Sequence, residues 1–248
     1  MIYAIVWAKK DSGKLNIILP GIKGISGEGL TTVAFEEITA IVTDIDKGNI
    51  VADSSGALAF ARVINELWQQ FTLLPMRFGS AMDSTEAIVK MLERNYSEIQ
   101  QNLQKVENKI EFGLKVFCDS EKLKAKLLEK TVPEAVSMVH PDAETKISVF
   151  REYVNRKLEA HRLEELVLSH VDALIALITD QLYLMNADCK FRKMVTEKTI
   201  IDGTFLLDKE KKKEVIWAVE HLQNLYPELN FILTGPWPPY NFVDFKVK

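Results

Sequence analysis

The sequence predicts an α+β protein with two domains, a small α+β domain in residues 1–108 and a ferredoxin-like domain in residues 109–248. Two observations predict this class. Short apolar runs separated by turn residues alternate with amphipathic stretches along the chain, which is typical of strands and helices that share a core. The second half also orders these runs as β-α-β-β-α-β, which is the ferredoxin-like plan.

Composition and charge favour a soluble protein with no nucleic-acid or membrane partner. Of the 248 residues, 47% are hydrophobic, which is ample for well-packed cores. The 31 basic and 35 acidic residues give a formal charge of -4, so no basic field attracts phosphate-rich partners or an anionic membrane surface. No apolar run approaches the roughly 18 residues that a membrane-spanning helix needs.

The compartment expected from the sequence is the cytoplasm. The start, MIYAIVWAKK, lacks the basic region and the small-residue cleavage site of a signal peptide, so we interpret it as a strand. The two cysteines, Cys118 and Cys189, are too few for a disulfide framework or a zinc site.

In the first domain, the apolar run at residues 2–8 predicts a central buried strand. The polar, glycine-rich residues 9–29 predict a long loop. Residues 31–35 and 38–44 predict a hairpin, and the apolar stripe of residues 57–71 predicts a half-buried helix.

A second helix of this domain follows the break at TLLPMRFGS. Asp83 with Glu86 three positions later resembles a capping box, and apolar residues continue at helical spacing from Ile88 to Val106. The first domain is therefore predicted as β-β-β-α-extended-α.

The second domain opens with a strand in EFGLKVFCD, where apolar residues alternate with others, and a short Lys-rich helix follows. No proline or glycine occurs from Asp142 to Asp202, and apolar residues recur there at three- and four-residue steps. This pattern predicts a long, coiled-coil-like helical insertion at about residues 142–185. The sequence leaves open whether that helix packs within the chain or self-associates with another copy.

The rest of the second domain completes the plan. Asp202-Gly203 predicts a hairpin turn between strands at residues 189–199 and 203–207. A helix then ends before Pro227, and the strand LNFILT leads into a tail rich in proline and aromatic residues.

The segment LLPMRFG is the first candidate site, because it places a charge in an apolar run. Its candidate residues are Pro75, Met76, Arg77, Phe78 and Gly79. A guanidinium in such a run must be paired if it is buried. We favour an internal salt bridge from Arg77 to a carboxylate, which would make this an extended core or edge segment; docking of a partner is the alternative.

The tail LTGPWPPYNFVDF is the second candidate. Its prolines fix φ and make an extended segment easy to order, so its aromatic side chains can be held in place. The favoured interpretation is a tail that caps the domain's own core, and the alternative is an anchor for a partner surface. The candidate residues are Trp237, Pro238, Tyr240 and Phe242, with Phe245 beyond them.

Other patterns give no support for catalysis, a cofactor or a metal. The glycines of residues 21–29 precede a predicted strand rather than a helix N-terminus, so a flexible loop is favoured over a phosphate site. The four histidines are scattered and fit no metal motif, so a metal enzyme that uses His161 or His170 is a remote alternative. No nucleophile motif surrounds a serine or a cysteine.

LLPMRFG after an amphipathic helix, EFGLKV about thirty residues later and LTGPWPPYNF at the end occur in this order in one chain. Together they resemble the GvpL/GvpF family of gas vesicle proteins. The chain departs from the family at Phe112, where a tryptophan is frequent, and in the first helix, where Phe60 to Val63 lack a frequent histidine.

The resemblance implies a non-enzymatic accessory, minor structural protein of the gas vesicle, which is a gas-filled shell in the cytoplasm. It implies a role in assembly or nucleation, in which the protein contacts the small hydrophobic shell protein, limits its aggregation and meets other accessory proteins. The alternative is a regulatory module that binds a small molecule, because ferredoxin-like domains host many functions.

Overall fold

The computed structural model describes residues 1–25, 27–45, 54–118, 145–193 and 199–243. Contacts within the chain define two compact units. Unit 1 comprises Met1–Phe112, Leu206–Lys209 and Gly235–Lys248, and unit 2 comprises Gly113–Phe205 and Glu210–Thr234. These units assign the tail to unit 1, whereas the sequence places it in the second domain; the division at residues 108 and 109 stays a prediction.

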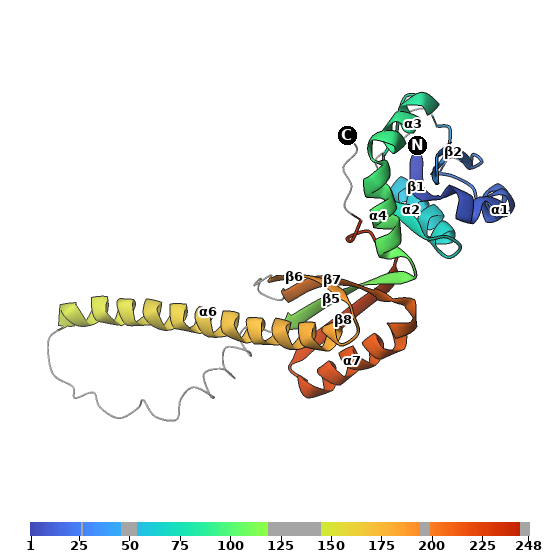
Figure 1. Ribbon diagram of the computed structural model, residues 1–248. Helices are drawn as coiled ribbons and strands as arrows, with labels where there is room; N and C mark the ends of the chain where they lie inside the picture. Colours follow the sequence, from blue (N-terminus) through green and yellow to red (C-terminus); the bar gives the residue numbers. More distant parts are fainter. Residues whose placement is uncertain (26, 46–53, 119–144, 194–198, 244–248) are drawn as a thin grey trace. The chain divides into compact units, whose positions relative to one another are not determined.

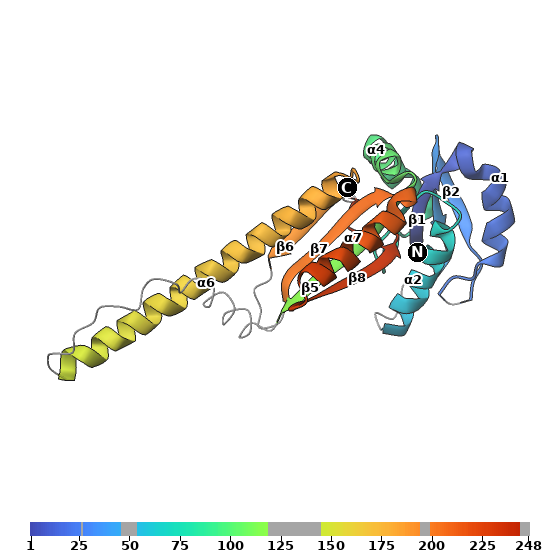
Figure 2. The same cartoon turned by 90° about the horizontal axis from the view of Figure 1, so that it is seen from below.

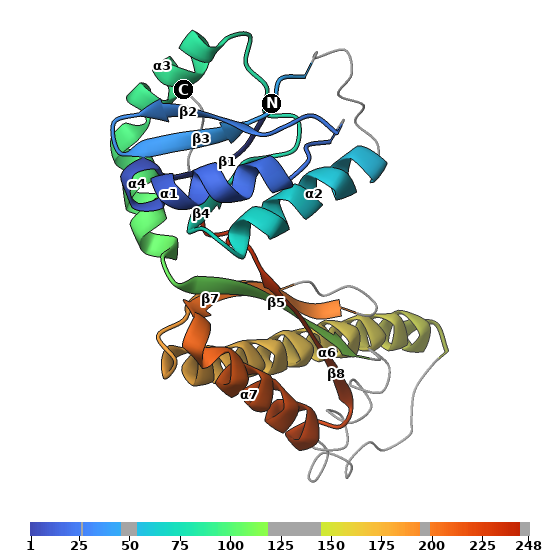
Figure 3. The same cartoon turned by 90° about the vertical axis from the view of Figure 1, so that its right-hand side faces the viewer.

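Unit 1 contains a four-stranded antiparallel sheet of order β2-β3-β1-β4. Its strands and the helices that connect them are β1 (Ile2–Trp7), α1 (Ala8–Ile18), β2 (Thr31–Phe35), β3 (Ile38–Val42), α2 (Ser54–Trp68) and β4 (Leu73–Pro75). The predicted hairpin is confirmed, since β2 pairs with β3 from Thr31↔Val42 to Phe35↔Ile38. Figure 3 shows α1 and α2 in front of this sheet.

The first unit therefore follows a β-α-β-β-α-β plan as well. The prediction that residues 9–29 form a long loop was wrong, because α1 and a short 3-10 turn (Leu19–Gly21) occupy more than half of that segment. Helix α1 buries the apolar Leu15 and leaves Ile17 80% exposed, so its sequence shows almost no apolar stripe. Because the sequence pattern does not indicate α1, the sequence does not predict the β-α-β-β-α-β order of unit 1.

Helices cover both faces of the unit 1 sheet. One core cluster joins Tyr3 and Val6 of β1 to side chains of α1 and α2. The other joins Ile2 and Ile5 to α3 (Thr85–Arg94) and α4 (Tyr96–Val106). An irregularity in the β1–β3 register between Ile2 and Ala4 allows Ile2 and Ile5, three positions apart, to share one face.

Two details of the helices differ from the prediction. Ser84, not Asp83, is the N-cap of α3, since its side chain accepts a hydrogen bond from the backbone N of Ala87 at 3.2 Å. The expected single helix breaks at Asn95, which is 2% exposed and donates from Nδ2 to the Met91 carbonyl at 2.7 Å. A side chain that bonds its own helix in this way offers the backbone an alternative to helical continuation.

The second sheet has the order β6-β7-β5-β8. Its elements are β5 (Lys109–Cys118), α6 (Thr145–Tyr183), β6 (Asp188–Lys193), β7 (Thr199–Asp208), a 3-10 turn (Lys209–Lys211), α7 (Lys212–Leu225) and β8 (Leu229–Trp237). This connectivity and order confirm the predicted ferredoxin-like plan. Figures 1 and 2 show α6 and α7 on the same face of the sheet.

The predicted hairpin turn at Asp202-Gly203 was wrong, because both residues lie inside β7. The glycine is explained by packing: a Cβ at Gly203 would collide with the ring of Phe191. The connection between β6 and β7, residues 194–198, lies outside the described residues, as does the predicted Lys-rich helix.

The long helix is confirmed as α6, which has 39 residues. Its buried side chains recur at three- and four-residue steps, at Val167, Val171, Leu174, Ile178 and Leu182. The segment His161–Tyr183 is long and apolar enough to span a membrane by length and composition, so the expectation of no such stretch was wrong. One such helix is weak support for a membrane span, since core helices of soluble proteins pass the same test. Self-association through α6 stays a prediction.

Candidate functional site

The segment LLPMRFG forms an edge strand. Leu73, Leu74 and Pro75 make up β4, which pairs only with β1 in the order of the unit 1 sheet. The backbone N of Met76 donates to the carbonyl of Tyr3 at 2.9 Å and extends this pairing by one residue. The expectation of an extended core or edge segment is confirmed.

Arg77 departs from its predicted role. Its side chain is exposed, and within the described parts of the chain no carboxylate lies within ion-pair distance of it. The expected internal salt bridge is therefore not found among the described residues, and the physical reason is that the Arg77 side chain is exposed to water and needs no buried partner. Phe78 instead packs against Phe60 with ring centroids 5.5 Å apart, and Gly79 has a φ of 86°, which suits glycine.

The tail returns to unit 1 and lies against the start of β5. Gly235 adopts a φ of 120°. A Cβ at this position would lie 2.9 Å from the carbonyl O of Glu111 and 3.1 Å from Cδ1 of Phe112. A residue with a side chain would not fit so close to the backbone of Glu111 and the ring of Phe112, so this contact requires the glycine of LTGPWPPYNF.

Glu111 and Asn241 form the polar link between these two segments. The Glu111 side chain is 2% exposed. One carboxylate oxygen accepts the backbone N–H of Asn241 at 2.8 Å, and the other accepts its Nδ2–H at 2.5 Å. A buried carboxylate needs such donors, because leaving it without hydrogen bonds is costly. Sequence reasoning missed Glu111, since alternation along β5 assigns it to the polar face.

Phe242 joins the core on the α3/α4 side of the sheet. It is 2% exposed and belongs to the same buried cluster as Leu74 and Met76. Lys105 of α4 lies over its ring, with Nζ 5.7 Å from the centroid. LLPMRFG and LTGPWPPYNF thus contribute to one core, and EFGLKV is joined to it through Glu111.

The tail divides between the two interpretations that the sequence left open. Pro238, Pro239 and Phe242 are buried and cap the core of unit 1. Trp237 and Tyr240 remain 44% and 41% exposed. Burial, together with the charge of Glu111, raises the pKa of the Tyr240 phenol to about 12. Phe245 lies outside the described residues.

The glycine-rich loop is tied to the sheet by hydrogen bonds. The Tyr3 hydroxyl accepts the backbone N–H of Ile25 at 2.9 Å, and Thr43 Oγ1 donates to the Gly29 carbonyl at 3.2 Å. A Cβ at Gly24 would lie 2.9 Å from the Tyr3 hydroxyl. At Gly24 the glycine thus permits close approach of side chains from the sheet.

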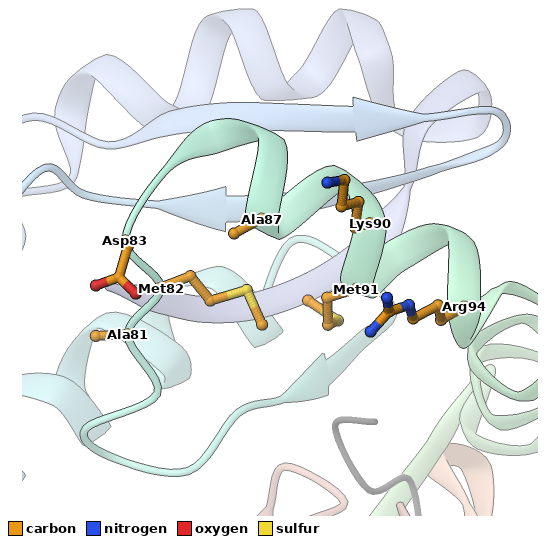
Figure 4. Close-up of a pocket in the computed structure, with 7 residues that line it drawn as sticks. All are labelled: Ala81, Met82, Asp83, Ala87, Lys90, Met91 and Arg94. Carbon is orange, nitrogen blue, oxygen red and sulfur yellow. The ribbon is translucent and has the colours of Figure 1, made fainter.

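A shallow pocket of about 280 Å³ lies between α3 and the segment before it. Figure 4 shows Met82 and Met91 side by side, with Asp83 at one end and Arg94 at the other. Its lining also includes Ala81, Ala87 and Lys90. A thioether floor with charges at its rim can bind a small ligand, but it contains no nucleophile and base in hydrogen-bond contact.

No catalytic or metal-binding group emerges within the described residues. Among them, no three His, Cys, Asp or Glu side chains are grouped as metal ligands would be. Cys118 is buried, and burial together with Asp188 raises the pKa of the Cys189 thiol to about 11, which disfavours a reactive thiolate. His161 approaches Glu165 at 3.5 Å on the exposed side of α6.

These features define the class: an α+β protein with two sheets of the same strand order, whose three characteristic segments meet at the unit 1 core. The family model described as "Gas vesicle synthesis protein GvpL/GvpF" matches residues 1–244. The chain belongs to this family and has a role related to gas vesicles, which confirms the resemblance.

Named relatives agree with this assignment. "Gas vesicle protein F1" of Halobacterium salinarum is 25% identical over 230 residues, which cover 91% of this chain and 87% of the relative. "Gas vesicle protein F" of a Nostoc species is 21% identical over 233 residues, which cover 91% and 92%.

Crystal structures of the gas vesicle protein GvpF show the same fold. The protein from Anabaena sp. aligns with a TM-score of 0.73 at 18% identity, over 99% of this chain and 95% of that one. The protein from Microcystis aeruginosa aligns with a TM-score of 0.73 at 17% identity, over 98% of both. The α+β fold class is confirmed.

Proposed function

We propose that this chain is an accessory, minor structural protein of the gas vesicle that acts in assembly or nucleation and is not an enzyme. It binds the small hydrophobic shell protein, limits its aggregation and meets other accessory proteins at the vesicle within the cytoplasm. Family membership supports the vesicle role. The single observation that carries the binding role is the exposed aromatic pair Trp237 and Tyr240 on an otherwise anchored tail.

The physical argument rests on the contrast within the tail. Phe242 and the two prolines fix its backbone on unit 1, so Trp237 and Tyr240 lose little conformational entropy when a partner covers them. Aromatic side chains with one apolar face and one polar tip are enriched at binding hot spots. An apolar shell subunit is a partner of matching chemistry.

A pull-down with purified shell protein tests the proposal. We expect the double variant Trp237→Ala, Tyr240→Ala to retain at least about tenfold less shell protein than the unaltered chain, the range for two hot-spot residues. Trp217→Ala is the matched control, because Trp217 is 65% exposed on α7 and lies in unit 2. Light scattering of the shell protein gives the effect on aggregation.

Two results would contradict the proposal, the first its binding role and the second its binding surface. The first is absence of binding by the unaltered chain together with normal vesicles in a deletion strain. The second is equal retention by the double variant, which would remove the tail from the binding surface while leaving the family role standing.

A small-molecule regulatory function is the second candidate, and the pocket at Met82 and Met91 is the observation that favours it. Binding a ligand to the folded state raises the melting temperature, and the shift grows with the logarithm of the ligand concentration above the Kd. A metabolite panel that shifts the melting temperature, with the shift lost in Arg94→Ala, supports this function. Flat melting curves across the panel count against it.

A further inference from the structure

The tail segment from Pro238 to Val243 is held by side-chain contacts rather than by strand pairing. Strand β8 ends at Trp237, and short turns follow, in which Tyr240 N donates to the Pro238 carbonyl and Phe242 N donates to the Pro239 carbonyl. Its anchors are the Asn241 amide and the Phe242 ring. Contacts of this kind recognise a short peptide.

The receiving surface, which we call the tail site, combines three chemistries. The Glu111 carboxylate accepts the backbone N–H and one Nδ2–H of Asn241, Lys105 lies over the Phe242 ring, and the buried cluster around Leu74 and Met76 contains that ring. An amide anchor next to an aromatic anchor specifies the dipeptide Asn-Phe in a turn, since Tyr240, Asn241 and Phe242 all lie in turns. Apolar packing alone would be enough to hold a segment that caps the core. The buried Glu111 carboxylate adds a requirement, because the bound segment must supply hydrogen-bond donors to it.

We propose that the tail site is a peptide-binding site for a turned Asn-Phe segment, which the chain fills with its own tail, and that the tail of a second copy fills it by exchange. The second copy is the occupant because its residues 236–243 carry the chemistry that is seated in the site. This inference does not depend on the shell protein as a partner.

Competition between the two tails determines the measurable behaviour. The chain's own tail acts at an effective concentration of about millimolar, so a free peptide must exceed that concentration to displace it. Loosening the chain's own tail therefore exposes the site. Asn241→Asp places a second carboxylate opposite Glu111 and repels the tail, and Phe242→Ala removes the aromatic anchor.

The probe is a fluorescein-labelled peptide of sequence PWPPYNFV, followed by fluorescence anisotropy with the full chain. We expect half-saturation near a millimolar concentration for the unaltered chain and at least about tenfold lower for Asn241→Asp and Phe242→Ala. The same peptide with alanine in place of its phenylalanine should not bind. Asn224→Asp, at an exposed position of α7, is the charge-matched control and should behave like the unaltered chain.

Circular dichroism establishes which variants are folded, and the unaltered chain needs no such check. The proposal is overturned if the peptide binds neither the unaltered chain at about 5 mM, several times the expected effective concentration, nor the variants that fold. Equal binding of the alanine-containing peptide also overturns it. Binding by peptides of unrelated Asn-Phe proteins but not by the chain's own sequence would replace the second copy with another partner and refute exchange.

Discussion

The link between Glu111 and Asn241 allows a quantitative test through a double-mutant cycle. Glu111→Gln keeps one acceptor and turns the other position into a donor, so one charge-assisted hydrogen bond to Asn241 is lost. Such a bond contributes about 1.5–3 kcal/mol, and the exposure of Asn241 to water lowers the expected loss to about 1–2 kcal/mol.

Asn241→Asp has a different cost, because it places two carboxylates within hydrogen-bond distance of each other. The tail can relieve this repulsion by leaving its site, so the loss cannot exceed what the tail contributes. Burial of one phenylalanine and the polar link set that limit at about 2–4 kcal/mol.

The double variant restores the complementarity of donor and acceptor. The glutamine amide at position 111 can donate to the new carboxylate at position 241, while its carbonyl still accepts the backbone N–H. We expect the double variant to be at least about 1.5 kcal/mol more stable than the sum of the single losses predicts.

Urea unfolding followed by tryptophan fluorescence measures these free energies. Of the four tryptophans, Trp7, Trp68 and Trp237 lie in unit 1, so the signal follows the unit that holds the link. Glu93→Gln, at an exposed position of α3, is the control and should change stability by less than about 0.5 kcal/mol. Additive losses within about 0.5 kcal/mol would refute the direct link between the two side chains.

Two further predictions concern the segments that meet in unit 1. Arg77→Ala should change the free energy of unfolding by less than about 0.5 kcal/mol, because the side chain is exposed; a loss above about 1 kcal/mol in thermal melts would restore the interpretation of Arg77 as one partner of an internal salt bridge. Gly235→Ala should cost about 2–4 kcal/mol through its positive φ and its close approach to Glu111, whereas Gly13→Ala, which has open space in α1, should be neutral or stabilising by about 0.5–1 kcal/mol. Equal effects of the two glycine variants in urea unfolding would contradict the packing argument.

The sequence predicts elements well where one residue pattern decides them. Strand β5 and helices α6 and α7 have strong periodicity, and all three are where the pattern indicates. Helix α1 fails this test because it is largely polar, and the hairpin signal at Asp202-Gly203 misleads because Phe191 covers the glycine within the sheet. Local patterns therefore identify elements that bury a clear stripe or face and miss those that bury a single side chain per turn.

The candidate site could be predicted only in part. The sequence identifies the tail and LLPMRFG as unusual, and the structure buries the parts of both that build the core. It could not identify Glu111, since the partner of this residue lies 130 positions later and no periodicity connects them. Contacts of this kind depend on how the chain returns to unit 1, which no local pattern encodes.

The convergence of the three motifs in unit 1 changes how variants in them should be interpreted. Pro75, Met76 and Phe242 are buried, so a vesicle defect caused by replacing them would first reflect a weakened core. Trp237 and Tyr240 lie in the same tail but remain partly exposed, so their replacement can affect binding without the same loss of packing. A search for the partner surface should therefore begin at these exposed positions, with the melting temperature of each variant measured beside its binding.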